Sequence, residues 1–161
     1  MTNPIRPTDD DARDMAQALL RDARVASLGV IQPDGTPLVT RIAFGLGPDG
    51  VPLSLVSDLA AHTRALRANA ACSLMIGAPG PRGDPLNHPR LTLQAKAGFV
   101  PHDHAGYDDM AAHYLRGHPK AKLYVGFADF HFALFAVNRA FLNGGFGKAF
   151  DLTPGDLGLS G

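Results

Sequence analysis

Hydrophobic and polar residues alternate along several segments of this chain, and a period of two is typical of strands with one buried face. Short polar turns such as Pro33-Asp34-Gly35 separate the first three segments, so we expect these strands to pair antiparallel. Residues 77–87 are rich in proline and glycine, which predicts an exposed loop. The pattern predicts strands at residues 25–32, 38–44, 53–57, 71–76, 90–100, 130–137 and 139–143.

Helical spacing of apolar residues marks three further segments. Thr8 is the predicted cap of a first helix that runs to about Arg24, with acidic residues at its positive end. Strands with helices between them favour a mainly β (α+β) fold, a closed or partly closed antiparallel β-barrel of six to seven strands with peripheral helices. The other helices are predicted at residues 58–70 and 103–115, with a helical turn at 121–125.

Composition narrows the class of protein without assigning a chemistry. The 161 residues suit a single domain over residues 1–161, with peripheral tails at 1–10 and 151–161. Fifteen basic residues balance fifteen acidic ones, which argues against nucleic acid or a membrane as a partner. Cys72 stands in an apolar strand, where we expect a buried thiol. With no signal-peptide-like segment we expect a cytoplasmic protein, and with no metal-ligand spacing we assign no metal and no catalytic residue.

The candidate chemistry lies where the third predicted strand gives way to the second helix. A helix start offers free backbone N–H groups and the positive end of the helix dipole, which together suit an anion. Ser57, His62 and Thr63 add side-chain donors there, and Arg41 on the preceding strand carries a guanidinium fork suited to a phosphate. A structural interpretation stays open, in which Ser57 or Asp58 only caps the helix and Arg41 is a surface charge.

Three runs of sequence carry a family resemblance: Leu38-Val39-Thr40-Arg41-Ile42-Ala43-Phe44, Ser57-Asp58-Leu59-Ala60-Ala61-His62-Thr63-Arg64-Ala65-Leu66 and Arg90-Leu91-Thr92-Leu93-Gln94-Ala95-Lys96-Ala97. Together they resemble the pyridoxamine 5′-phosphate oxidase-like split-barrel superfamily. The chain ends in Asn143-Gly144-Gly145-Phe146-Gly147-Lys148-Ala149, which resembles more narrowly the haem-utilisation (HugZ-like) branch of that superfamily. With His118-Pro119-Lys120-Ala121 and Asp129-Phe130, the matches extend over about residues 12 to 150.

This resemblance implies a split barrel that binds FMN and forms a homodimer, with two flavins at the subunit interface. Arg41 would hold the FMN phosphate, and the junction residues would complete the cradle. Val56 would run along the edge of the isoalloxazine ring, and Arg90 would approach the flavin from the strand that it begins. We expect an FMN-dependent oxidoreductase, while a non-catalytic flavin carrier and a cofactor-free relative stay open. The implied cofactor-binding residues are Arg41, Val56, Ser57, His62, Thr63 and Arg90.

The sequence departs from the oxidase at the substrate site. The oxidase binds its substrate phosphate with a tyrosine, an arginine and a serine, and the matching positions here are Tyr114, His118 and Lys122. A lysine of the oxidase is replaced by Leu46, and its late Arg-x-His pair by Asn143-Gly144-Gly145-Phe146. A phosphate without donors is costly to desolvate, so we expect inefficient oxidation of pyridoxamine phosphate.

The haem-utilisation branch supplies the alternative, a protein that binds or degrades haem. Imidazole is a suitable haem ligand, and His102 and His104 are the leading candidates. A histidine-rich loop is more often solvated surface. Members of this branch also carry a C-terminal extension that does not follow Leu159 in this sequence, so no iron ligand is carried over. The seven histidines are His62, His88, His102, His104, His113, His118 and His131.

Overall fold

The computed structural model describes residues 3–159, in which nine strands form one sheet. The strands are β1 (Ile5–Arg6), β2 (Val25–Ile31), β3 (Pro37–Ala43), β4 (Gly45–Leu46), β5 (Pro52–Ser57), β6 (Ala71–Ile76), β7 (Arg90–Phe99), β8 (Phe130–Asn143) and β9 (Ala149–Leu152). The helices are α1 (Asp10–Asp22), α2 (Ala61–Ala68) and α3 (Tyr107–Gly117), with 3-10 turns η1 (Pro85–Asn87), η2 (Pro119–Leu123) and η3 (Gly155–Leu157).

The sheet is curved but does not close. Its order is β1-β9-β8-β7-β6-β2-β3, and β5 pairs with β4 and with the first half of β8. Because β3 ends the hydrogen-bonded order, the barrel is split, and the expected split-barrel fold is confirmed. All neighbouring strands are antiparallel except β1 and β9, whose parallel pairing makes the sheet mixed.

The two final strands predicted from the sequence are one continuous strand, β8. Gln94 lies opposite Arg139 and Ala95 lies opposite Val137, so Asn138 is the extra residue of a β-bulge. The bulge interrupts the alternation without ending the strand. The sequence pattern also missed β1, β4 and β9, which are too short to show a period. Strand β1 and the end of β9 lie in the predicted tails, whose outermost residues 1–2 and 160–161 lie outside the described part of the chain.

Capping determines where the helices begin. Asp9, not Thr8, is the cap of α1, and its carboxylate accepts a hydrogen bond from the Ala12 N–H at 2.8 Å. The Thr8 hydroxyl instead donates to the Asp151 carbonyl on β9, which ties the start of α1 to the end of the chain. The second helix, α2, starts three residues later than predicted, because residues 57–60 form the turn that leaves β5.

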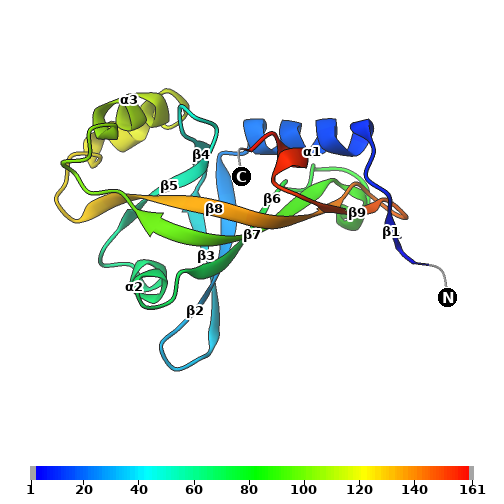
Figure 1. The fold of residues 1–161 in the computed structure, drawn as a ribbon, viewed down its shortest axis with the longest axis horizontal. Helices are drawn as coiled ribbons and strands as arrows, with labels where there is room; N and C mark the ends of the chain where they lie inside the picture. Colours follow the sequence, from blue (N-terminus) through cyan, green and yellow to red (C-terminus); the bar gives the residue numbers. More distant parts are fainter. Residues whose placement is uncertain (1–2, 160–161) are drawn as a thin grey trace.

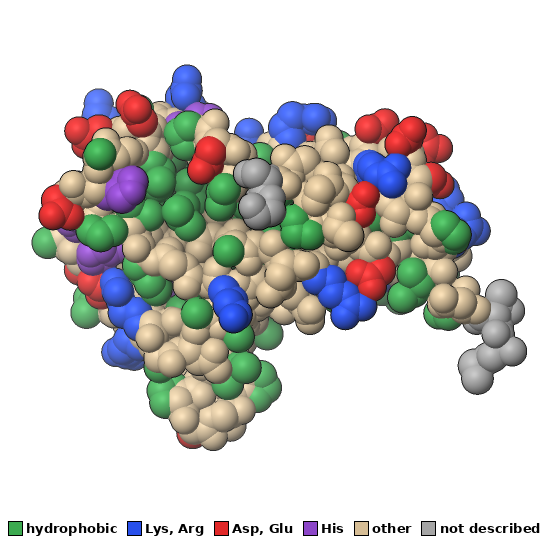
Figure 2. Space-filling model, in the orientation of Figure 1, with side chains coloured by type: hydrophobic (Ala, Val, Ile, Leu, Met, Phe, Trp, Pro, Cys, Tyr) green, Lys and Arg blue, Asp and Glu red, His purple; other side chains and the backbone are tan. Residues whose placement is uncertain are grey.

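Two apolar clusters fill the molecule. The larger lies between α1, α2 and the inner face of the sheet, around Leu28, Leu66 and Phe135. The smaller lies under α3 and η2, around Leu55 and Phe132. Figure 1 shows α1 and α3 along one side of the sheet and α2 on the other. On β2, β3 and β6, the face turned away from the larger cluster carries exposed apolar side chains, and we call it the outer face. The β2–β3 hairpin projects from the body of the molecule and has hydrophobic side chains at its surface (Figure 2).

Candidate functional site

The outer face brings together residues from three strands. Ser27 on β2 lies opposite Arg41 on β3 and opposite Met75 on β6. Directly paired residues point to the same side of a sheet, so these three side chains form a row across the outer face. Arg41 is exposed, and Met75 keeps 46% of its surface accessible.

Two hollows lie along this face. The first, of about 290 Å³, is lined by the row of Arg41, Ser27 and Met75 together with the chain that leaves β6. The second, of about 420 Å³, follows the same strands to β7 and includes Gly29, where the missing side chain leaves the backbone open. We call the two hollows together the outer-face groove.

Arg41 dominates the electrostatics of the first hollow. None of the nine residues that line this hollow is acidic, and no carboxylate of residues 3–159 forms an ion pair with Arg41. An arginine with its fork free can donate two hydrogen bonds to one oxyanion, and the Ser27 hydroxyl beside it can donate a third. The groove therefore combines a positively charged end, suited to an anion, with a lining that is largely apolar along the second hollow.

The junction between β5 and α2 is held by polar contacts of its own. The Ser57 hydroxyl donates to the Asp129 carboxylate at 3.3 Å and accepts from the Leu59 N–H at 3.2 Å. The Asp58 carboxylate accepts from the Arg67 guanidinium at 2.9 Å and lies 3.2 Å from the His131 ring. The hydrogen bond from Arg67 lowers the pKa of Asp58, so this carboxylate is ionised at neutral pH. These contacts fix the turn against the start of β8.

The first turn of α2 places its two candidate residues differently. His62 is half-buried, and its Nδ1 is hydrogen-bonded to the Thr40 hydroxyl at 2.9 Å. Burial lowers the pKa of His62, which favours the neutral ring. The Thr63 side chain is fully buried, and its hydroxyl has no hydrogen-bond partner among the described residues. No side chain in this part of the chain caps α2. The Thr63 N–H donates to the Ala60 carbonyl at 3.1 Å, so the N–H groups of Ala61 and His62 are the donors left at the helix start.

The remaining two candidates lie on β5 and at the start of β7. Val56 is buried on β5 opposite His131, so only its backbone is placed to meet a ligand. Arg90 opens β7, and its guanidinium donates to the carbonyls of Leu86 and His88. A side chain on Gly77 would collide with the backbone of Arg90, which shows that Arg90 passes directly beside a residue lining the first hollow.

The structure therefore does not bring the six sequence-predicted residues into one cradle. Arg41 lines the outer-face groove, and the backbone of Arg90 lies beside Gly77 without lining the groove itself. Ser57, His62 and Thr63 form a second group at the start of α2, and Val56 is buried on β5. Thr40 and Arg41 are neighbours on β3 and point to opposite sides of it, which separates the two groups. Sequence reasoning missed Ser27 and Met75, whose place beside Arg41 follows from strand register alone.

The described residues offer few other reactive or metal-binding side chains. Cys72 is buried, its thiol donates to the Ala95 carbonyl, and burial raises its pKa to about 11. Among residues 3–159, no group of histidine, cysteine or aspartate side chains is arranged to hold a metal ion. None of the helices in that range has the length and the apolar content to span a membrane.

Comparison with known proteins places this architecture. The family described as Pyridoxamine 5′-phosphate oxidase matches residues 12–143, most of the chain. The chain belongs to the pyridoxamine 5′-phosphate oxidase family. This agrees with the split sheet.

Several proteins that are similar to this chain in sequence or in fold carry names that refer to haem. The non-canonical haem oxygenase HOZ of Arabidopsis thaliana chloroplasts is 38% identical over 104 residues, which are 62% of this chain and 29% of the plant protein. A haem-binding protein from Mycobacterium smegmatis is 29% identical, with a TM-score of 0.81 over 95% of this chain and 61% of the other. The haem storage protein HutZ from Vibrio cholerae, 20% identical, shares the fold with a TM-score of 0.70 over 87% of this chain and 97% of its own.

Proposed function

We propose that this protein binds FMN in the outer-face groove and uses it as an oxidoreductase. The observation that carries the proposal is Arg41, an exposed guanidinium without a carboxylate partner among the described residues, at one end of an apolar groove. A phosphate monoester needs such a donor, and a flat ring system needs such an apolar lining. The group fits the residues present.

Each part of the groove has a distinct role in this proposal. Arg41 and Ser27 bind the phosphate, and Gly29 with the apolar side chains of Val39 and Met75 faces the ring. His62 on α2 contacts the edge strand β3 through Thr40, and its pKa is lowered by burial. Its Nε2 is a further donor for a ligand that extends past the edge of β3. When bound, FMN supplies hydride and electron transfer, and the protein supplies orientation and positive charge.

A second copy of the chain is part of the proposal. Val39 is 70% exposed on the outer face, and Val25, Ile31 and Met75 on the same face are also exposed. Several exposed apolar side chains on one face are typical of a protein interface. A homodimer would cover this surface and enclose the groove, which would shield a bound ring from water.

The residues at the oxidase's substrate positions do not favour pyridoxamine phosphate as the substrate. Of the positions that resemble the substrate donors of the oxidase, Tyr114 is buried against His118, with ring centroids 4.4 Å apart. His118 Nε2 donates to the Phe44 carbonyl at 2.8 Å. Both side chains therefore already have partners within the protein.

Haem binding is the second candidate, and the relatives named above favour it. The chain spans only 29% of the plant haem oxygenase and 61% of the mycobacterial chain, so their activities do not transfer directly. His62 contacts Thr40 of the edge strand β3 through its Nδ1, and β3 is one of the strands of the outer face. Its Nε2 is the nitrogen we would assign to iron.

The absorption spectrum of the purified, untreated chain tests the proposal. FMN binding predicts a yellow protein that releases FMN when denatured, and turnover of a reduced nicotinamide would then identify an enzyme. A Soret band on haem titration, with no uptake of added FMN, would favour the second candidate. A colourless protein that takes up neither FMN nor haem would contradict both.

A further inference from the structure

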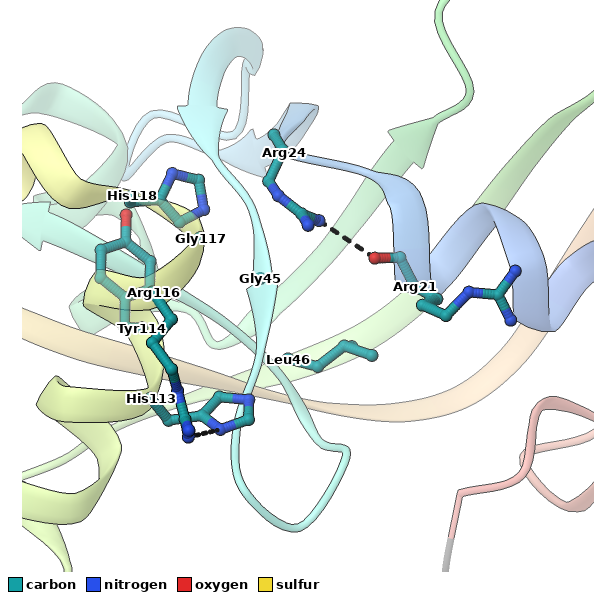
Figure 3. Close-up of a pocket in the computed structure, with 9 residues that line it drawn as sticks. All are labelled: Arg21, Arg24, Gly45, Leu46, His113, Tyr114, Arg116, Gly117 and His118. Atoms are coloured by element: carbon teal, nitrogen blue, oxygen red, sulfur yellow. Dashed lines mark hydrogen bonds between the residues drawn. The ribbon is translucent and has the colours of Figure 1, made fainter.

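Hydrogen bonding sets one histidine apart from the others. His88 lies in the segment between β6 and β7, residues 77–89, which we call the β6–β7 loop, and both nitrogens of its ring have backbone partners. None of the other histidines in the described chain has partners at both ring nitrogens. Figure 3 shows one of these, His113, whose Nδ1 is bonded to the guanidinium of Arg116.

The two contacts of His88 fix the protonation state of its ring. The Gly80 N–H can only donate, so Nδ1 accepts this hydrogen bond, at 2.9 Å, and carries no proton. The Arg82 carbonyl can only accept, so Nε2 carries the proton and donates it, at 2.7 Å. The conformation of the loop therefore requires the neutral ring with its proton on Nε2.

The first half of the β6–β7 loop depends on this ring. Among the hydrogen bonds of the described chain, residues 78–83 take part in two, and both are with His88. The ring also packs against the inside of the loop. A Cβ on Gly80 would lie 2.9 Å from Cε1 of His88, so glycine lets the backbone approach the ring closely enough for the hydrogen bond.

The ends and the second half of the loop are held by contacts that do not involve the His88 ring. A Cβ on Gly77 would lie 2.6 Å from the Pro89 carbonyl oxygen, so the two ends of the loop are in close contact. The Asn87 side-chain oxygen accepts from the Phe146 N–H at 3.2 Å, which ties the second half to the segment after β8. Loss of the His88 contacts would therefore free the first half of the loop and leave the rest in place.

The charged groups around His88 do not compensate for a second proton on its ring. The Arg90 guanidinium of β7 donates to the His88 carbonyl at 3.3 Å, and Arg82 adds another positive charge on the loop. The Asp84 carboxylate accepts from the backbone of η1, and no carboxylate in the described chain forms an ion pair with the His88 ring. A proton on Nδ1 would face the Gly80 N–H, and that hydrogen bond would be lost.

We propose that His88 is a pH-dependent lock on the β6–β7 loop. The neutral ring holds residues 78–83 in place, and a proton on Nδ1 releases them; histidine is the side chain suited to such a change between about pH 8 and pH 5. Ala78 and Pro79 line the first hollow together with Arg41, so release opens the phosphate end of the outer-face groove. This consequence for a ligand rests on the proposed function, whereas the lock itself does not.

NMR of the full chain without added flavin tests the lock. At pH 7.5 the nitrogen-15 shifts of the His88 ring should show an unprotonated Nδ1 and a protonated Nε2. At pH 5.5 the Gly80 N–H should lose about fivefold in protection from hydrogen exchange, relative to the intrinsic rate at each pH, as expected for one lost hydrogen bond. The Phe146 N–H, bonded to the neutral amide of Asn87, is the internal reference and should keep its protection.

His88→Gln and His104→Gln form a matched pair of variants. His104 also accepts a backbone N–H at its Nδ1, that of Gly106 at 3.0 Å, and its Nε2 has no partner in the described chain. The pH dependence of Gly80 exchange should disappear in His88→Gln and persist in His104→Gln. Gly80 protection that does not change with pH in the native chain, a change that persists in His88→Gln, or a proton on Nδ1 at pH 7.5 would each overturn the proposal.

FMN titration of the same samples tests the consequence for the groove. FMN affinity should fall more between pH 7.5 and pH 5.5 in the native chain than in His88→Gln. An equal fall in both would overturn the link between the lock and the groove. Absence of FMN binding at both pH values would count against the proposed function alone, because Gly80 exchange is measured without flavin.

Discussion

Thr40 Oγ1 and His62 Nδ1 lie 2.9 Å apart, and this hydrogen bond joins the edge strand β3 to the first turn of α2. The two residues are 22 positions apart in the sequence, and their contact closes the open side of the split sheet against a helix. Because Thr40 occupies Nδ1, only Nε2 of His62 is left for solvent or a ligand.

The half-buried ring of His62 makes stability depend on pH. Its pKa is lowered by burial, so the unfolded state binds more protons once the pH falls below about 6.5, the ordinary value for histidine. We expect the free energy of unfolding to be unaffected by this group above that pH and to fall below it. Urea unfolding between pH 8 and pH 5 should show this slope, and His62→Gln should flatten it. A slope unchanged in His62→Gln, or equally flattened in the control His113→Gln, would disprove the assignment.

Removal of the Arg41 side chain should weaken FMN binding. Arg41→Ala deletes a charge-assisted hydrogen bond to the phosphate, and we expect a loss of ~1.5–3 kcal/mol in binding free energy. Fluorescence titration with FMN measures this, with Arg82→Ala as the control because Arg82 is exposed in the loop after β6. Unchanged affinity in Arg41→Ala would reject the phosphate site.

A charge on the outer face should break the proposed dimer. Val39→Glu places a carboxylate where Val39 is 70% exposed, and desolvation of this charge would oppose association. Light scattering should give a dimer for the native chain and a monomer with weaker FMN binding for the variant. Leu123→Glu, at another exposed residue, should leave the dimer intact. A native chain that is monomeric and still retains FMN would contradict this part of the account.

Asp156 connects the end of the chain to α1 and should contribute to stability. Its carboxylate accepts from the Arg13 Nε at 2.8 Å and from the N–H and hydroxyl of Thr153. Hydrogen bonds from Thr153, and then from Arg13, lower its pKa, so this contribution is present above about pH 3.8 and is lost as the pH falls further.

Asp156→Ala should lower the free energy of unfolding at pH 7 by about 1–2 kcal/mol. We expect the lower end of this range because the contacts lie near the surface. Asp10→Ala removes the exposed partner of the same arginine and should change the free energy of unfolding by less than about 0.5 kcal/mol. Denaturant unfolding compares the two variants. Equal effects would show that Asp156 is no more than a surface ion pair.

The thiol of Cys72 should be unreactive in the folded protein. Burial raises its pKa to about 11, so very little thiolate exists at neutral pH. We expect alkylation to be about a hundredfold slower than in the urea-unfolded chain, as followed by mass spectrometry. Comparable rates in the two states would mean that the β2–β6 region opens readily.

The fold was largely predictable because strands such as β2 and β7 alternate between buried and more exposed residues over most of their length. Residues 25–32 correspond closely to β2, and residues 90–100 to β7. The hydrophobic pattern did not predict strands that are too short to alternate, and it misplaced the end of a strand where a bulge interrupts the alternation. The two strands β1 and β9 are too short to show a period, and Asn138 interrupts the alternation of a strand that continues past it.

The candidate site was less predictable. Spacing along the sequence does not show which face of β3 packs against α2, so it does not show which β3 side chains point toward that helix. Arg41 and His62 were expected in one cradle, yet Thr40 takes the side of β3 that faces His62, and Arg41 takes the other.

A crystal structure of the chain bound to FMN tests the central claim most directly. The account predicts the FMN phosphate within hydrogen-bonding distance of the Arg41 guanidinium, with the ring along the outer face of β2 and β6. A phosphate bound at the start of α2 without Arg41, or a groove that stays empty at saturating FMN, would contradict it.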